Sequence, residues 1–66
     1  MYRRIRDLRE DADLTQQQIA EILHMQKTTY RRYESGEREL PFNIAILLAK
    51  QYGVSLDYLA GLTEDK

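Results

Sequence analysis

Apolar residues recur along the chain at helical spacing, and glycine, proline or short polar stretches interrupt them. Ile5 and Leu8 stand three positions apart, with Ala12 a turn later, which predicts an amphipathic helix over residues 2–12. No stretch alternates apolar and polar residues in the manner of a half-buried strand. Further helices are expected at residues 16–23, 27–35, 42–52 and 56–60. The pattern therefore predicts an all-α fold of five helices.

Residues with known preferences for helix ends support these boundaries. Thr15 and Gln18 have the spacing of a capping box at the start of the second helix. Gly36 and Gly53 follow the third and fourth helices, where glycine adopts a left-handed conformation without steric cost. Ser55 is a good N-cap for the last helix. Two further boundaries are expected, at Leu40-Pro41 before the fourth helix and at Gly61 after the fifth.

The inward-facing positions of these helices predict a single hydrophobic core. Because the chain has only 66 residues, this core is thin, and much of it comes from tyrosine, whose hydroxyl can still reach water. The expected core residues are Ile5, Leu8, Ile19, Ala20, Leu23, Met25, Tyr30, Tyr33, Phe42, Ile46, Ala49, Tyr52, Val54, Leu56 and Leu59.

The second and third predicted helices are separated by only His24, Met25 and Gln26. Tyr30 and Tyr33 form an inward pair on the third helix, which leaves cationic and hydroxyl side chains on its other faces. Two helices joined by so short a turn, with the second one reaching outward, are typical of a helix-turn-helix that places a helix in a DNA major groove.

A series of short motifs resembles the lambda-repressor-like, Xre-type helix-turn-helix family. The motifs occur in the family's order and spacing, and the resemblance extends from about residue 5 to residue 62 without a gap. It implies a compact five-helix DNA-binding domain. The matching residues are Leu14-Thr15-Gln16, Ile19-Ala20, Leu23, Met25-Gln26, Thr29-Tyr30, Arg32-Tyr33-Glu34-Ser35-Gly36, Pro41, Leu48-Ala49 and Tyr52-Gly53-Val54-Ser55-Leu56-Asp57-Tyr58-Leu59.

The resemblance also implies which residues meet double-stranded DNA. Gln16, Gln26 and Arg38 match positions that contact the phosphate backbone, although Glu37 departs from the basic character usual in this loop. Base reading falls to the outer face of the third helix, where arginine and lysine suit the two acceptors of guanine. Thr29 and Glu34 are expected to be structural, with Glu34 holding the loop near Gly36. The expected base-reading residues are Lys27, Thr28, Arg31 and Arg32.

The overall charge of −1 argues against a generally basic surface, but positive charge is concentrated locally. Within residues 27–38, four cationic residues (Lys27, Arg31, Arg32, Arg38) and two glutamates give a local charge of +2. This distribution suits a small footprint on DNA. The Arg-rich start of the first helix could also lie near a phosphate, although a solvated charged face is the simpler interpretation.

Other classes of function find little support. The chain has no cysteine, and its one histidine lies in the helix-turn-helix turn, so neither a metal site nor a catalytic centre is expected. We expect no enzyme activity, no cofactor and no small-molecule ligand. The longest apolar run, residues 44–49, is too short to cross a bilayer, and no signal peptide is expected at the charged N-terminal helix, so a cytoplasmic location is expected.

Residues 1–62 are expected to form the DNA-binding domain, and residues 63–66 a frayed tail. The fourth helix is apolar on more than one side, and such a helix is either buried on both sides or meets a partner. A homodimer acting on a short inverted repeat is therefore expected, most simply as a transcriptional repressor. The expected interface residues are Ile44, Leu47, Tyr58 and Leu62.

Two alternatives remain open at this point. One is an antitoxin or adaptor whose main partner is another protein, and the other is a DNA-binding fragment of a longer regulator. A single-strand stacking surface formed by tyrosines is a weaker possibility, because Tyr30 and Tyr33 face inward.

Overall fold

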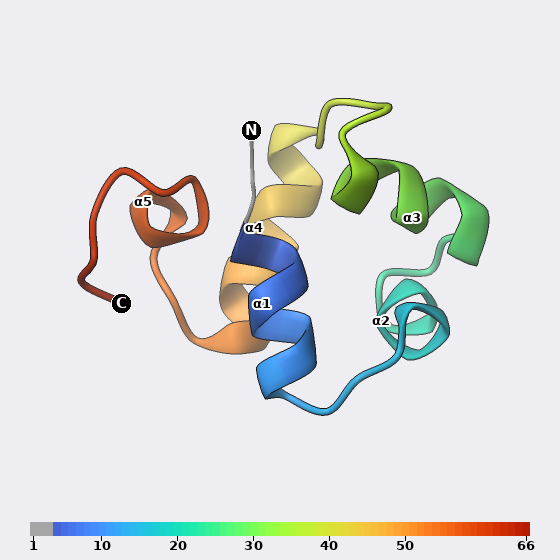
Figure 1. Ribbon diagram of the computed structural model, residues 1–66, viewed down its shortest axis with the longest axis horizontal. Helices are drawn as coiled ribbons and strands as arrows, with labels where there is room; N and C mark the ends of the chain where they lie inside the picture. The colour runs from blue at the N-terminus through green and yellow to red at the C-terminus, as the bar shows by residue number, and fades with distance from the viewer. Residues whose placement is uncertain (1–3) are drawn as a thin grey trace.

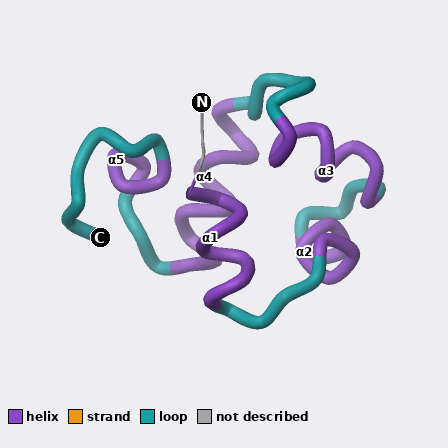
Figure 2. The backbone as a smooth tube through the Cα atoms, viewed as in Figure 1, coloured by secondary structure: helices purple, strands orange, loops and turns teal. Residues whose placement is uncertain are grey.

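The structure is a computed structural model that describes residues 4–66, and it contains five helices joined by short loops (Figure 1). Helices α1 and α4 lie at the centre, with α2 and α3 on one side and α5 on the other (Figure 1). The described part of the chain contains no strand (Figure 2), and none of its helices has the length and apolar character needed to cross a membrane. The all-α prediction is confirmed, while residues 2 and 3 of the first predicted helix lie outside the described residues. The helices are α1 (Arg4–Asp11), α2 (Gln16–Ile22), α3 (Lys27–Ser35), α4 (Phe42–Tyr52) and α5 (Leu56–Leu59).

The helix ends form where local chemistry predicts them. At the start of α2, the Thr15 hydroxyl accepts a hydrogen bond from the Gln18 N–H (3.1 Å), and the Gln18 side chain accepts one from the Thr15 N–H (2.8 Å). These two bonds satisfy donors that the first turn of a helix cannot pair internally. Gly36 and Gly53 end α3 and α4 with φ angles of 87° and 66°, in the region that favours glycine. The capping box and both glycine stops are confirmed.

Two residues outside the glycines also adopt left-handed backbone conformations. Asp13, between α1 and α2, and His24, in the turn between α2 and α3, each have a φ angle of 59°. Histidine and aspartate are among the non-glycine residues that tolerate this region best. The sharp turn of the helix-turn-helix therefore depends on a conformation at His24 that the hydrophobic pattern does not reveal.

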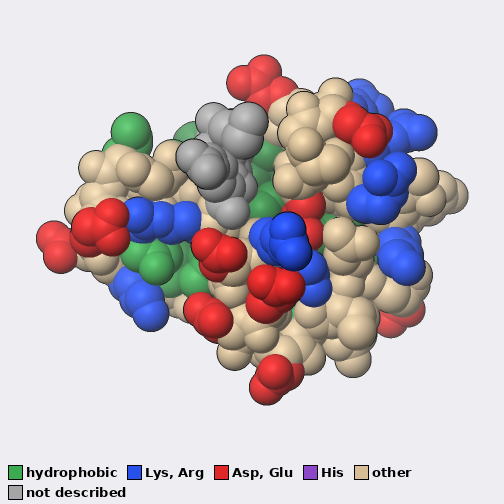
Figure 3. Space-filling model, in the orientation of Figure 1, with side chains coloured by type: hydrophobic (Ala, Val, Ile, Leu, Met, Phe, Trp, Pro, Cys, Tyr) green, Lys and Arg blue, Asp and Glu red, His purple; other side chains and the backbone are tan. Residues whose placement is uncertain are grey.

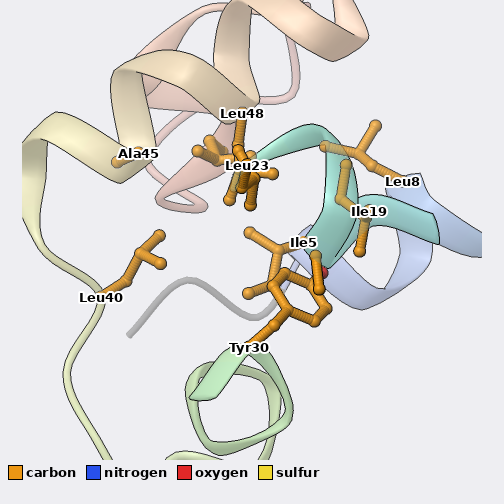
Figure 4. Close-up of a cluster of buried hydrophobic side chains, with 10 residues drawn as sticks. Ile5, Leu8, Ile19, Leu23, Tyr30, Leu40, Ala45 and Leu48 are labelled. Atoms are coloured by element: carbon orange, nitrogen blue, oxygen red, sulfur yellow. The ribbon is translucent and has the colours of Figure 1, made fainter. Parts of the chain in front are cut away.

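The core lies where α1, α2, α3 and α4 meet, and every one of these helices contributes to it. Tyr30 points from α3 toward Ile5 and Ile19, and Leu48 approaches Leu23 from α4 (Figure 4). Tyr30, Ile5, Ile19, Leu48 and Leu59 are the largest fully buried side chains. Burying a side chain of this size contributes about 1.5–3 kcal/mol, so this small set supplies much of the driving force for folding. The predicted core residues Leu8, Ala20, Leu23 and Ala49 are also buried, and Met25, Tyr33, Tyr52, Val54 and Leu56 are partly buried.

The inward face of α4 differs from the prediction. Phe42, expected in the core, is 64% exposed, whereas Ala45 and Leu48, which were not expected there, are fully buried. Ile46 is only half-buried. Because α4 is apolar on several sides, its sequence fits more than one stripe, and packing selects the one through Ala45, Leu48, Ala49 and Tyr52. Two further differences are that Ala12 is exposed and that Leu40, in the loop before Pro41, is buried.

The C-terminal residues fold back on α1, although a frayed tail was expected. The guanidinium of Arg4 donates to the Thr63 carbonyl and to the Glu64 carboxylate, both at 2.8 Å. The same group lies 4.1 Å from the centre of the Tyr58 ring, close enough for a cation–π interaction. In addition, the Ser55 N–H donates to the Lys66 carbonyl at 2.9 Å. Arg4 therefore contacts the tail and α5, which lie on the opposite side of α1 from α3 (Figure 1).

Candidate nucleic-acid interface

Helices α2 and α3 are held together by a tight, hydrogen-bonded turn. The Met25 N–H donates to the Ala20 carbonyl (2.9 Å) and the His24 N–H to the Glu21 carbonyl (3.1 Å), which closes the end of α2. Helix α3 then buries Tyr30 completely and Tyr33 and Thr29 partly. One face of α3 is thus fixed against the core, and the opposite face is left to solvent. The burial of Tyr30 also leaves its ring unavailable for stacking on a nucleic-acid base.

The exposed face of α3 carries the predicted base-reading side chains. Lys27 and Arg31 lie one turn apart, Thr28 and Arg32 also lie one turn apart, and all four are exposed. Figure 3 shows Lys and Arg side chains gathered over this side of the molecule, with acidic side chains among them. Sequence position and structure therefore bring the four predicted residues onto one accessible surface, which we call the α3 outer face.

A buried ion pair beside this face, together with Gln16, joins three helices. The Arg9 guanidinium of α1 meets the Glu34 carboxylate of α3 in a two-bond arrangement, with Nε–Oε2 at 2.7 Å and Nη2–Oε1 at 3.2 Å. Arg9 also donates to the Leu14 carbonyl at 2.8 Å, and the Gln16 amide of α2 donates to Glu34 Oε1 at 3.0 Å. The Glu34 side chain is only 5% exposed. Glu34 is structural as predicted, but its partners are Arg9 and Gln16, not the loop near Gly36.

The pKa values of this cluster follow from burial and from the paired charges. Burial by itself would raise the pKa of Glu34, but the hydrogen bonds from Arg9 and Gln16 outweigh it, and the net pKa is lowered. The hydrogen bond to Glu34 raises the pKa of Arg9. The Tyr30 hydroxyl lies near the Glu34 carboxylate and is influenced by its charge, but it makes no hydrogen bond to any residue within 4–66. Burial, and then the nearby carboxylate, raise the pKa of Tyr30, so this phenol stays neutral.

Gln16, predicted to contact the phosphate backbone, lies between two surface hollows. One is an open groove that runs from the end of α1 to the start of α2, with Lys27 at its α3 side and with Glu10 and Asp13 also in its lining. The other is smaller and lies over the Arg9–Glu34 pair, with Arg6 and Arg31 at its edges. The Gln16 amide nitrogen has a second N–H beyond the one directed at Glu34. Both hollows therefore contain amide and cationic donors, together with carboxylates from Glu10 and Asp13 in the first and from Glu34 in the second.

The other two predicted backbone contacts, Gln26 and Arg38, are exposed near the two ends of α3. Gln26 is the N-cap residue of α3, but its side chain makes no capping hydrogen bond. Arg38 lies beyond Gly36 in the loop, and its N–H donates to the Arg32 carbonyl at 3.2 Å. Glu37, between Gly36 and Arg38, lies 3.7 Å from Arg31 Nη1 and 3.9 Å from Arg32 Nε. The sequence did not indicate that one carboxylate faces both arginines.

The predicted dimer-interface residues divide into two groups. Leu47 and Leu62 are exposed, at 47% and 78%, whereas Ile44 and Tyr58 are partly buried and pack against the core. Phe42, which was wrongly predicted to lie in the core, is a further exposed apolar residue of the C-terminal half. The large apolar side chains exposed in the C-terminal half are therefore Phe42, Leu47 and Leu62, and Ile22 at the end of α2 is exposed as well.

The sequence of this chain is similar to those of known proteins that share a helix-turn-helix. Residues 5–59 match a family described as helix-turn-helix. An uncharacterized HTH-type transcriptional regulator, YobD, from Bacillus subtilis (strain 168) is 41% identical over 66 residues, which cover 98% of this chain and 59% of that protein. The cryptic phage CTXphi transcriptional repressor RstR from Vibrio cholerae is 38% identical over 61 residues, covering 92% of this chain and 55% of the repressor. The chain thus spans little more than half the length of these two relatives. No solved structure matches it significantly.

Proposed function

Because the chain belongs to the helix-turn-helix family, we propose that it binds double-stranded DNA sequence-specifically and regulates transcription, most simply as a repressor. The α3 outer face enters the major groove, where each base pair presents a distinct pattern of donors and acceptors. Phosphate contacts from Gln16, Gln26 and Arg38 fix its position. One of the two arginines reads a base and the other meets a phosphate, since adjacent residues point about 100° apart on a helix.

The observation that carries this proposal is the two-sided character of α3. Tyr30 is fully buried on one side, while Lys27, Thr28, Arg31 and Arg32 are exposed on the other. The buried side fixes the orientation of the helix, so the exposed side chains project from a rigid element. Such preorganisation favours base recognition, because less conformational entropy is lost on binding.

Selection of duplexes from a random pool tests the proposal and reads the site in one experiment. We expect enrichment of a short motif, bound in preference to unselected duplex at the same salt concentration. A variant in which Arg31 and Arg32 are both alanine should enrich no motif, while Lys50→Ala, in the last turn of α4, should enrich the same one. Failure of the unmodified protein to enrich any motif would contradict sequence-specific binding.

We further propose that two copies bind together on an inverted repeat, through the surface around Leu47 and Leu62. Both side chains are exposed apolar groups in the C-terminal half of the chain, and neither belongs to the α3 outer face. A symmetric pair would set two α3 helices about 34–36 Å apart, one turn of DNA. Joining two half-sites in this way raises affinity without any new base contact.

Sedimentation of the protein at micromolar concentration, with and without a palindromic duplex, tests the dimer. Leu47→Glu should remain folded and give a monomer that binds the full palindrome much more weakly, with little change on a half-site. Lys50→Glu, which changes charge elsewhere on α4, serves as the control. An unmodified protein that stays monomeric in both conditions would contradict the dimer and favour a different protein as the partner.

A further inference from the structure

The turn after α3 holds Glu37 in a defined place. The Arg32 carbonyl accepts hydrogen bonds from the Gly36 N–H (3.1 Å), the Arg38 N–H (3.2 Å) and the Ser35 hydroxyl (3.1 Å). The Ser35 oxygen in turn accepts from the Glu37 N–H at 3.3 Å. The backbone on both sides of Glu37 is therefore tied to the last turn of α3, which keeps the Glu37 side chain close to that end of the helix.

The Glu37 carboxylate lies across the two arginines of the α3 outer face. One oxygen is 3.7 Å from Arg31 Nη1, and the other is 3.9 Å from Arg32 Nε. All three side chains are about half exposed, and pairs of this kind add little to folding stability. We therefore expect Glu37 to matter mainly for binding, when Arg31 or Arg32 approaches another anion such as a DNA phosphate.

We propose that Glu37 is a specificity-determining residue, which disfavours phosphate contacts by Arg31 and Arg32 more than it disfavours guanine contacts. This inference rests on the proposed DNA-binding function. The carboxylate faces Nη1 of Arg31 and Nε of Arg32, and each guanidinium has further N–H groups. In Arg32 the terminal pair of nitrogens remains free to meet the two acceptors of guanine while the ion pair persists.

A phosphate differs from a guanine edge because it is itself an anion. An arginine that grips a phosphate must either leave Glu37 or bring the carboxylate next to another negative charge, and like charges at an interface are penalised. Binding to arbitrary DNA depends almost entirely on phosphate contacts, whereas binding to a target also uses base edges. The carboxylate should therefore weaken binding to arbitrary DNA more than it weakens binding to the target.

Glu37→Gln and Glu39→Gln form a matched pair that tests this inference. Both remove one negative charge from the same exposed loop, but Glu39 belongs to no ion pair among residues 4–66. Kd is measured for the selected duplex and for a scrambled duplex of equal length and composition, at one salt concentration. Thermal unfolding of each variant confirms that the fold is unchanged.

Glu37→Gln should tighten binding to the scrambled duplex about five- to tenfold, and to the selected duplex no more than about twofold. Glu39→Gln should shift both duplexes by the same small factor. If Glu37→Gln and Glu39→Gln give the same ratio of the two Kd values, the inference is wrong, although the proposed function stands. If the unmodified protein does not discriminate between the duplexes, the proposed function and this inference fail together.

Discussion

Arg9 and Glu34 are 25 positions apart in the sequence, yet their side chains meet with Nε–Oε2 at 2.7 Å and are only 12% and 5% exposed. The pair connects α1 to α3, and Gln16 adds a link from α2 through Glu34. It lies beside the α3 outer face, since Arg31 and Glu34 line the same surface hollow. The orientation of the proposed recognition helix therefore depends on a buried charge interaction as well as on hydrophobic packing.

Glu34→Gln should lower the free energy of unfolding by about 2–3 kcal/mol at pH 7, because it leaves the Arg9 charge without its buried partner. The pKa of Glu34 is lowered from its ordinary value of 4.5, so the unfolded chain takes up this proton more readily. The stability contributed by the carboxylate is thus present above about pH 4.5 and is lost as the pH falls through the folded-state pKa. Denaturant unfolding between pH 7 and pH 3 should show the gap between the two proteins closing.

Glu39→Gln is the control for this experiment, because it removes an exposed carboxylate of the same type. Its unfolding free energy should follow that of the unmodified protein across the pH range. A Glu34→Gln deficit that stays constant down to pH 3 would show that the carboxylate charge is not what stabilises the junction.

Gly53→Ala should destabilise the protein by about 1 kcal/mol through backbone conformation alone. Gly53 ends α4 with a φ angle of 66°, and a Cβ atom there would meet no other atom within 4 Å. Gly53→Asn should recover part of the loss, because asparagine tolerates this region better than alanine. Chemical denaturation measures all three proteins, and an alanine variant as stable as the original would contradict this explanation of the helix end.

Arg38→Ala should weaken binding to target and scrambled duplexes alike, and should reduce the slope of log K against log salt by about one. Gln16→Ala should weaken both duplexes with little change of slope, because the amide carries no charge. Since Gln16 also donates to Glu34, thermal unfolding of the Gln16→Ala protein must be measured as well, to separate a loss of stability from a loss of DNA contact. Lys50→Ala removes a charge from the last turn of α4 and should leave the slope unchanged. An unaltered slope for Arg38→Ala would remove Arg38 from the phosphate contacts.

The sequence predicted those features that depend on nearby residues. Thr15 and Gln18 at the start of α2, and Gly36 at the end of α3, act within one helical turn, so their spacing was sufficient. The exposed face of α3 was also predictable, because Tyr30 and Tyr33 define its inner side. These local signals account for the five helices and for the placement of Lys27, Thr28, Arg31 and Arg32 on one surface.

Features that depend on packing between distant segments were not predictable in the same way. The inward face of α4 was misjudged at Phe42 and Leu48, because an apolar residue on either side satisfies the same periodicity. Neither Arg9 nor Glu34 carries a local sign of its partner, and Glu37 was recognised only as a departure from a basic loop. Side-chain pairing across the fold therefore had to come from the structure.

The role of Arg32 is the most direct test of the claim that α3 reads bases. Kd is measured for the unmodified protein, Arg32→Ala and the control Lys50→Ala on the selected site and on duplexes that change one base pair at a time. Arg32→Ala should cost about 1–3 kcal/mol on the selected site and remove the preference at one base pair while keeping the others. Equal weakening on every duplex, with all preferences intact, would make Arg32 a phosphate contact and contradict the base-reading role proposed for it.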